Sequence, residues 1–304
     1  MAYQKYRYST TIIHYITYLF VRLIAGILNC IPYYLMRKLA TLAGLIFYYV
    51  HSPRRNIALD NLRQALGNEL PECELIQIAR KSFINLVLLG LEVIRIPRVI
   101  KNIPRYMTIE RKEIVFDELK KGNGVIFLIA HYGNWEWGAV MAGYVNYPMS
   151  AVGRPMKNRF IYRYIERLRQ STGLKSLNKK GVAREIMQEL RNNRVVAILF
   201  DQYAGSSGVL VPFFGRPAYT TSAVAQLAIR TGASVVPGYC TRNKDGTHTI
   251  YITDPIPTIK TNDRQADIIK NTCNYNANLE SWIRKNPDQW FWVHKRWKTP
   301  RRYA

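Results

Sequence analysis

Apolar residues follow two different spacings along the chain, and the change from one to the other divides it into two parts. Up to about residue 95 they recur every three or four positions, as on one face of a helix. This spacing predicts helices at about 11–32, 35–50, 54–66 and 72–95. Pro53 and Pro97 follow the second and the last of these segments, where proline favours the end of a helix.

From about residue 105, short apolar runs alternate with amphipathic segments, as in an α/β fold with a mainly parallel sheet flanked by helices. Strands are expected near 106–110, 124–130, 149–153, 195–200, 234–240 and 248–252, and helices near 111–121, 134–145, 157–171, 181–193, 220–231 and 264–286. Ligands of such sheets bind at the carboxyl ends of the strands. Because His131, Arg154 and Asp201 each follow the end of a predicted strand closely, we expect them to share one site.

The first predicted helix is amphipathic in an unusual way, because its polar side is narrow and its apolar side is broad. Mostly polar residues recur on one stripe, opposite a broad apolar side; the stripe comprises Thr11, His14, Tyr18, Arg22, Ala25 and Asn29, and the apolar side comprises Ile12, Ile16, Leu19, Leu23 and Ile27. This pattern favours a membrane-associated helix that lies in the interface, or that enters the bilayer with its polar stripe packed on protein. Ordinary core helices are the alternative. We expect residues 1–52 to form membrane-anchoring helices and 53–304 the main domain.

The net charge and the cysteine residues indicate which partners and which cellular compartment to expect. With 44 Lys and Arg against 20 Asp and Glu, the net charge is +24, which indicates an anionic partner such as nucleic acid, lipid headgroups or an acidic carrier protein. No zinc-finger spacing or RNA-binding aromatic motif is present, so we expect no nucleic acid. The four cysteines form no C-x-x-C pair and indicate free thiols in a reducing compartment. No cleavable signal peptide is evident, so the main domain is expected in the cytoplasm.

Candidate chemistry is concentrated at the end of the apolar run that begins at Val125. The run stops at His131, and Glu136 follows five residues later. The two would lie roughly 140° apart on one regular helix, so they cannot pair in that way. If the chain turns at Gly133 and Asn134 caps a new helix, Glu136 can reach back to His131. The result is an imidazole oriented by a carboxylate, which can take a proton from a substrate hydroxyl.

Other interpretations of these residues remain open. His131 could cap a helix, with Glu136 complementing the helix dipole. A metal site formed by His131, Glu136 and Asp201 is a further alternative, but the five histidines include no His-x-x-x-His pair or other ligand spacing, so we expect no metal. Arg154 at a strand end suits a phosphate or a developing oxyanion, and a surface arginine is its alternative.

The helix predicted near 157–171 carries a row of like charges. Arg159, Arg163 and Arg167 are spaced four residues apart, which is mildly unfavourable for the helix itself. The row is explained either as a docking surface for an acidic partner or as a solvated face. Further along, Phe213 and Phe214 either border an acyl-chain slot or pack in the core.

Several of these segments resemble one known family. The segment 130–137, Ala-His-Tyr-Gly-Asn-Trp-Glu-Trp, resembles the His-x-x-x-x-Glu motif of the lysophospholipid acyltransferase superfamily. Its exact residues are most similar to those of the bacterial lipid A late acyltransferase branch, the lauroyl and myristoyl transferases. Further segments match in order at 152–155, 200–202, 211–215 and 287–294. The likeness runs from about residue 35 to the C-terminus. It implies a glycerol-3-phosphate acyltransferase-like fold, and it implies that Asp201 belongs to the site.

The resemblance also implies a reaction. A fatty acyl group would pass from a thioester, on acyl carrier protein or coenzyme A, to a hydroxyl of a lipid A precursor at the cytoplasmic face of the inner membrane. His131 would act as general base and Glu136 as its orienting group, while Arg154 holds phosphate or oxyanion and Arg159 and Arg163 contact the donor. No cofactor is expected, because a thioester is already activated. Acylation of another polar lipid, such as a lysophospholipid, an aminolipid or a glycolipid, is the alternative; a basic nucleic-acid-binding protein is a more distant one.

Overall fold

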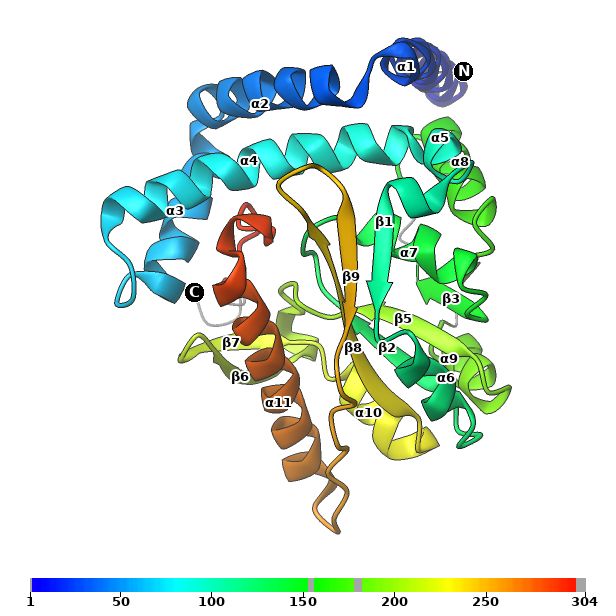
Figure 1. The fold of residues 1–304 in the computed structure, drawn as a ribbon, viewed down its shortest axis with the longest axis vertical. Coiled ribbons are helices and arrows are strands. Elements are labelled where there is room, and N and C mark those ends of the chain that lie inside the picture. Colours follow the sequence, from blue (N-terminus) through cyan, green and yellow to red (C-terminus); the bar gives the residue numbers. More distant parts are fainter. Residues whose placement is uncertain (1, 153–155, 178–181, 299–304) are drawn as a thin grey trace.

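A seven-stranded sheet organises the protein (Figure 1). The computed structural model describes residues 2–152, 156–177 and 182–298. The strands lie in the order β1-β9-β8-β2-β5-β3-β4; their bounds are β1 Met107–Glu110, β2 Val125–Ile129, β3 Met149–Val152, β4 Lys175–Leu177, β5 Val195–Leu199, β8 Ser234–Arg242 and β9 His248–Ile252. All neighbours pair in parallel except β8 and β9, which are antiparallel. The predicted mainly parallel α/β sheet is therefore confirmed.

The two central strands are apolar on both sides because helices cover both faces of the sheet. In β2, Val125, Ile126 and Leu128 are fully buried. β2 pairs with β5 in a register that sets Ile129 beside Leu199. Since the two strands are parallel and in register, the residues just beyond their carboxyl ends also lie side by side.

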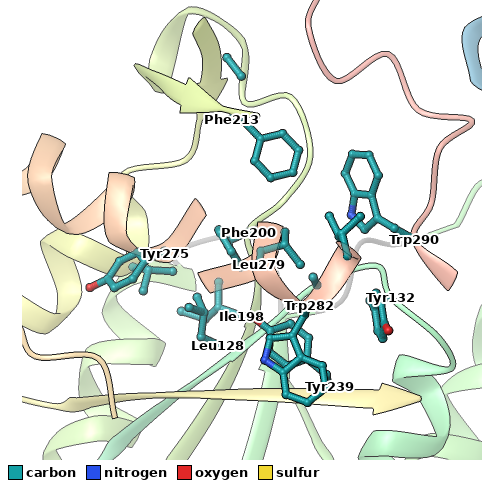
Figure 2. Packing of buried hydrophobic residues seen from close by; sticks show 14 of the residues in the cluster. Leu128, Tyr132, Ile198, Phe200, Phe213, Tyr239, Tyr275, Leu279, Trp282 and Trp290 are labelled. Atoms are coloured by element: carbon teal, nitrogen blue, oxygen red, sulfur yellow. The ribbon is translucent and has the colours of Figure 1, made fainter. Parts of the chain in front are cut away.

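Each face of the sheet has its own buried core. On one face, α9 (Val182–Arg191), α10 (Ala223–Thr231) and α11 (Arg264–Lys285) cover Leu128, Ile198 and Tyr239. Figure 2 shows α11 supplying Tyr275, Leu279 and Trp282 to this core, where Trp282 stacks on Tyr239 with ring centres 4.7 Å apart. On the other face lie α6 (Glu113–Leu119), α7 (Trp135–Tyr144) and α8 (Arg159–Gln170).

A layer of helices crosses the end of the sheet where β2 finishes (Figure 1). It is formed by α1 (Ala2–Cys30), α2 (Tyr33–Val50), α3 (Ser52–Leu66) and α4 (Glu72–Ile94), followed by α5 (Ile96–Val99) and the short 3-10 helix η1 (Ile103–Arg105). α2 packs closely along α4, where a side chain at Gly44 would come within 2.5 Å of the Ile84 backbone. Only glycine permits that approach.

The orientation of α1 agrees with the amphipathic pattern. Its polar stripe faces the protein: the carbonyl of His14 accepts a hydrogen bond from Asn158, and Arg22 lies over the ring of Tyr164 on α8. The opposite side is exposed and apolar, and α2 continues it; its exposed residues include Ile12, Ile16, Leu19, Leu23, Ile27, Leu35, Leu39, Leu42 and Ile46. Of the helices in the described residues, the segment Thr11–Cys30 is the one long and apolar enough to cross a membrane.

Three strands in the described residues, and the short helices α5, η1 and η2 (Gly205–Ser207), were not predicted from the sequence. β4 is only three residues long, and β6 (Val209–Phe213) and β7 (Arg216–Thr220) form a separate two-stranded antiparallel sheet, preceded by the 3-10 helix η2. The turn of this hairpin contains Phe214, and both Phe213 and Phe214 are buried in the core. Core packing is therefore the interpretation that the structure supports for this pair.

Candidate active site

A tight turn at the end of β2 positions His131. Gly133 has a positive φ of 57°, and a side chain there would collide with the Cys240 carbonyl at 1.7 Å, so the turn requires glycine. The backbone N–H of Gly133 donates to the carbonyl of Gln289 in η3 (Pro287–Gln289), and that of Asn134 donates to the carbonyl of Cys240. The Asn134 side chain accepts from the N–H of Trp137 and caps α7, as the sequence predicted.

His131 pairs with Asp201, which follows the end of β5. Its Nδ1 lies 2.7 Å from one carboxylate oxygen of Asp201, and its backbone N–H donates to the other oxygen at 3.0 Å. The indole N–H of Trp290 donates to that second oxygen at 2.9 Å. The carboxylate is almost fully buried, whereas the imidazole side chain is 17% exposed. The aspartate is thus held by three donors, and the histidine keeps access to a substrate.

The charge and hydrogen bonds of Asp201 determine which ring nitrogen of His131 carries the hydrogen. Burial raises the pKa of the Asp201 carboxyl, but the charge of His131 and the hydrogen bonds from His131 and Trp290 outweigh burial, and the pKa ends below its usual value. A carboxylate accepts hydrogen bonds and cannot donate one, so Nδ1 of His131 carries the hydrogen. The Nε2 atom is left with a free lone pair. The arrangement is that of a general base whose tautomer is fixed by a carboxylate.

Glu136 occupies a different place from the one expected, and this corrects the predicted geometry. Its two carboxylate oxygens bind the guanidinium of Arg169 on α8, at 2.6 and 2.9 Å. Arg169 also donates to Glu166 at 2.8 Å. The physical reason is that Glu136 lies in the first turn of α7, which faces α8, while the Nδ1 atom of His131 is already occupied by Asp201. The imidazole is oriented from the neighbouring strand end and not from its own motif.

An apolar cavity adjoins the turn, between the sheet and α7. Ala130, Tyr132 and Trp135 line it on the side of His131, and Glu136 and Arg169 form part of its wall. The remaining lining is mostly apolar and includes many small residues; it comprises Phe127, Ile129, Gly138, Ala139, Met149, Ala151, Val152, Leu174, Ser176, Ala197, Leu199, Gly238, Tyr239, Cys240 and Ile250. A side chain at Gly238 would lie 2.1 Å from the Phe127 ring. Small residues on the strands therefore create the space.

A second, smaller cavity contains His131 itself. It lies between α4 and the segment after η3, and Leu86, Leu89, Phe291 and Val293 contribute to its wall. Trp135 lines both cavities, and its ring lies 4.9 Å from the imidazole of His131. His131 thus lines the smaller of two largely apolar spaces, and the neighbouring Trp135 lines both.

Comparison with known proteins identifies the family of the chain. The model of the bacterial lipid A biosynthesis acyltransferase family matches residues 3–299. The chain belongs to this family. The matching model covers the helical layer, the sheet and the C-terminal segment that holds Trp290, so the assignment rests on nearly the whole chain and not on one motif.

Curated relatives match parts of this acyltransferase-family chain. A phosphatidylinositol mannoside acyltransferase of Mycolicibacterium smegmatis is 31% identical over 136 residues, which cover 43% of this chain and 45% of that protein. The corresponding Mycobacterium tuberculosis protein is 32% identical over 126 residues, 40% of each chain. A lipid A biosynthesis palmitoleoyltransferase of Escherichia coli is 26% identical over 190 residues, 60% of each chain. The matches span less than two thirds of each relative's length.

The structure describes only some of the other site residues that the sequence predicted. Arg154 lies outside the described residues. Arg159 and Arg163 are exposed on α8 together with Arg167, and none of the three makes an ion pair with a described residue. α8 lies against α1 through Phe160, which contacts Tyr15 and Tyr18. The helix that carries the basic row therefore packs directly on α1.

A buried charge network lies behind the turn that carries His131, and sequence patterns did not reveal it. Glu92 of α4 binds Arg242 of β8 through both oxygens, at 2.6 and 3.0 Å. The same carboxylate accepts from Asn134 at 2.7 Å and from Tyr33 of α2 at 2.6 Å. Burial raises the pKa of Glu92, but the charges of Arg242 and His248 outweigh it and hold the pKa well below its usual value. This carboxylate connects the helical layer to the cap of α7.

Arg169 and Trp290 were also missed as site residues. Arg169 belonged to a run of basic residues, and Trp290 to an aromatic segment, so neither position stood out by type or spacing.

Among the described residues, no group of three or more His, Cys, Asp and Glu side chains is arranged to hold a metal ion.

Proposed function

We propose that the protein transfers a fatty acyl group from an acyl thioester to a hydroxyl of a membrane glycolipid. The observation that supports this most directly is the His131–Asp201 pair, whose imidazole lines one apolar space and lies beside Trp135, which lines a second as well. A general base with a fixed tautomer suits a hydroxyl nucleophile, and apolar spaces on either side suit acyl chains.

The proposed reaction needs one proton relay. Nε2 of His131 removes the proton as the acceptor hydroxyl attacks the thioester carbonyl, and the imidazolium formed is stabilised by Asp201. The tetrahedral intermediate then expels the thiolate, which takes the proton from His131. An ester and a free thiol result, and the enzyme returns to its starting state without a covalent intermediate.

Two predicted groups complete this proposal. Arg154 would stabilise the oxyanion or hold a phosphate, as the family motif implies. Glu136 keeps a place in the site as the partner that neutralises Arg169 in the wall of the larger cavity. That cavity would hold the acyl chain of the donor, because its floor of small strand residues leaves room along the sheet.

We further propose that the exposed apolar side of α1 and α2 enters the cytoplasmic face of the inner membrane. The two helices together expose fifteen large apolar side chains among the described residues, and these form one continuous surface. An apolar surface of this size on a protein is normally covered by a membrane or by another protein. The basic row Arg159, Arg163 and Arg167 on α8 would lie beside the membrane and receive an acidic acyl carrier protein.

The acceptor is the least constrained part of the proposal. A lipid A precursor is the first candidate, in keeping with the family and with the Escherichia coli relative. A mannosylated phospholipid is the second, and the observation that favours it is the higher local identity to the phosphatidylinositol mannoside acyltransferases.

A transfer assay separates these candidates. Purified full-length protein in detergent-lipid mixtures is given a radiolabelled acyl thioester on acyl carrier protein or on coenzyme A, together with a lipid A precursor, a phosphatidylinositol mannoside or a lysophospholipid. The proposal expects the label in an ester of one glycolipid. Transfer to lysophospholipid alone would replace the glycolipid acceptor, and hydrolysis with no transfer to any lipid would contradict acyl transfer.

A further inference from the structure

A third cavity lies apart from the catalytic turn, where α1 ends and α2 begins. Its volume is about 380 Å³, and it shares no lining residue with the two cavities beside His131. The wall combines the joint between the two helices, the end of α4 and the β8–β9 turn; its residues are Pro32, Tyr33, Tyr34, Arg95, Arg98, Arg105, Tyr106, Asp245, Gly246 and Thr247. A space of this size accommodates a small polar group.

The lining is strongly positive. Arg95, Arg98 and Arg105 contribute three guanidinium groups, and none of them forms an ion pair with a carboxylate in the part of the chain that the structure describes. Asp245 is the one acidic residue in the wall, and its carboxylate accepts hydrogen bonds from the backbone N–H and hydroxyl of Thr247. Three unpaired cations around one cavity indicate an anionic ligand.

Helix capping explains part of this cluster but leaves most donors unused. Arg95 donates through Nη1 to the carbonyls of Leu28 and Ile31, and Arg98 donates through Nη1 to the carbonyl of Asn29, so both stabilise the C-terminus of α1. A guanidinium has five N–H donors, however. The guanidinium of Arg105 is exposed and has no hydrogen bond or ion pair with any described residue. Capping therefore does not account for its position.

The position of the cavity relative to the apolar surface indicates the source of the anion. Ile27 and Leu35 flank the joint at Pro32 on the exposed apolar side, and Tyr34, which lines the cavity, is itself 66% exposed. When the apolar side enters a bilayer, the cavity lies at its edge, at the depth of the lipid headgroups. Tyrosine and arginine are the residues that favour this depth.

We infer that this cavity binds the phosphate group of a membrane lipid. Arg98 and Arg105 hold the phosphate oxygens from the open side, and Arg95 adds charge from behind. The site is separate from the catalytic pair, so the inference does not depend on the proposed acyl transfer. It requires only that the exposed apolar side of α1 and α2 meets a membrane.

Vesicle binding by the purified full-length protein tests this site. The bilayer matrix is digalactosyldiacylglycerol, which contains no phosphate, and it includes either phosphatidic acid or cholesteryl hemisuccinate, a carboxylate, matched in electrophoretic mobility. Diffuse attraction to negative charge is then equal in the two sets. We expect wild-type protein to bind the phosphatidic acid vesicles about tenfold more tightly.

Three variants locate the preference. Arg98→Ala with Arg105→Ala should bind both vesicle types within about twofold of each other. Arg105→Ala alone, which removes no side-chain hydrogen bond or ion pair among the described residues, should lose part of the preference and leave the protein folded. The control, Lys38→Ala with Arg55→Ala, removes an exposed cation of α2 and a half-buried cation of α3, both outside the cavity; it should weaken binding to both vesicle types and keep the preference.

The outcomes decide the inference. Absence of a preference in the wild-type protein, or a preference that survives in the double variant at Arg98 and Arg105, would overturn it. Inorganic phosphate, added at the phosphate concentration of the vesicles, should compete weakly. If it abolishes the preference at that concentration, the cavity takes free phosphate and the assignment to a lipid is wrong.

Discussion

Nδ1 of His131 lies 2.7 Å from a carboxylate oxygen of Asp201, a residue 70 positions further along the chain. Sheet register brings them together. Ile129 of β2 pairs with Leu199 of β5, and each member of the catalytic pair stands two residues beyond that point. A histidine and an aspartate at the same level of adjacent parallel strands meet without any bend in either strand, and Trp290 then closes the far side of the carboxylate.

Asp201→Asn should reduce kcat about 10³- to 10⁴-fold, because an amide that donates to Nδ1 favours the tautomer with its hydrogen on Nε2, where the lone pair is needed. Donor KM should change little, since Asp201 does not line the larger cavity. Steady-state kinetics on folded protein, checked by circular dichroism, measures both constants. A kcat within tenfold of wild type would remove Asp201 from the catalytic pair.

Glu136 is expected to act through Arg169 and not through the imidazole. Glu136→Gln leaves the guanidinium in the cavity wall with Glu166 as its remaining partner, so donor KM should rise and activity should fall. Adding Arg169→Met removes the stranded charge, and the double variant should therefore recover activity relative to Glu136→Gln. Kinetics of the two single variants and the double variant form a cycle. If the double variant is no better than Glu136→Gln, the pairing with Arg169 is not the role of Glu136.

Glu136 and Asp201 show which parts of the site could be predicted from the sequence and which could not. The apolar run before His131 located the base, and Gly133 and Asn134 correctly predicted the turn and the helix cap. Periodicity does not reveal which strands are neighbours, so the local candidate Glu136 was chosen over the distant Asp201 as the orienting group. The choice required the order of strands in the sheet.

Other features were hidden for related physical reasons. Glu92 lies on a helix whose buried side is mostly apolar, and its partner Arg242 is 150 residues away, so no local spacing links them. β4 is too short to show a period, and the β6–β7 hairpin places two phenylalanines at its turn, where polar residues are the usual signal. Long elements with a regular period, such as α2, α4 and α11, were predicted closely.

Removal of the buried carboxylate at Glu92 should destabilise the fold strongly. Glu92→Ala leaves the buried guanidinium of Arg242 without its partner and frees Asn134 and Tyr33, at a cost of about 3–5 kcal/mol. Glu72→Ala is the matched control, because its ion pair with Arg63 is half exposed and screened by solvent, so its loss should cost far less than the loss of Glu92. Urea unfolding in detergent compares the two free energies. Equal losses of unfolding free energy in the two variants would show that the buried network stabilises the fold no more than the exposed ion pair does.

The basic row on α8 should govern the encounter with a protein-bound donor. Arg159→Glu with Arg163→Glu is expected to raise KM for acyl carrier protein and to weaken its salt dependence, while kcat stays near wild type, because rim charges steer association without shaping the transition state. A coenzyme A donor should be affected less. Arg230→Glu with Lys270→Glu changes the charge equally on α10 and α11 and should have little effect. Equal responses of both donors would instead indicate a contact with the lipid acceptor or the bilayer.

The proposed chemistry rests on His131, and one measurement addresses it most directly. Wild-type protein and His131→Ala are compared in the radiolabelled transfer assay at saturating donor and acceptor, with the folded and membrane-bound state of the variant verified by circular dichroism and flotation. Loss of the general base should lower kcat by more than about a hundredfold, without detaching the protein from membranes. Near-wild-type transfer by His131→Ala would contradict the account.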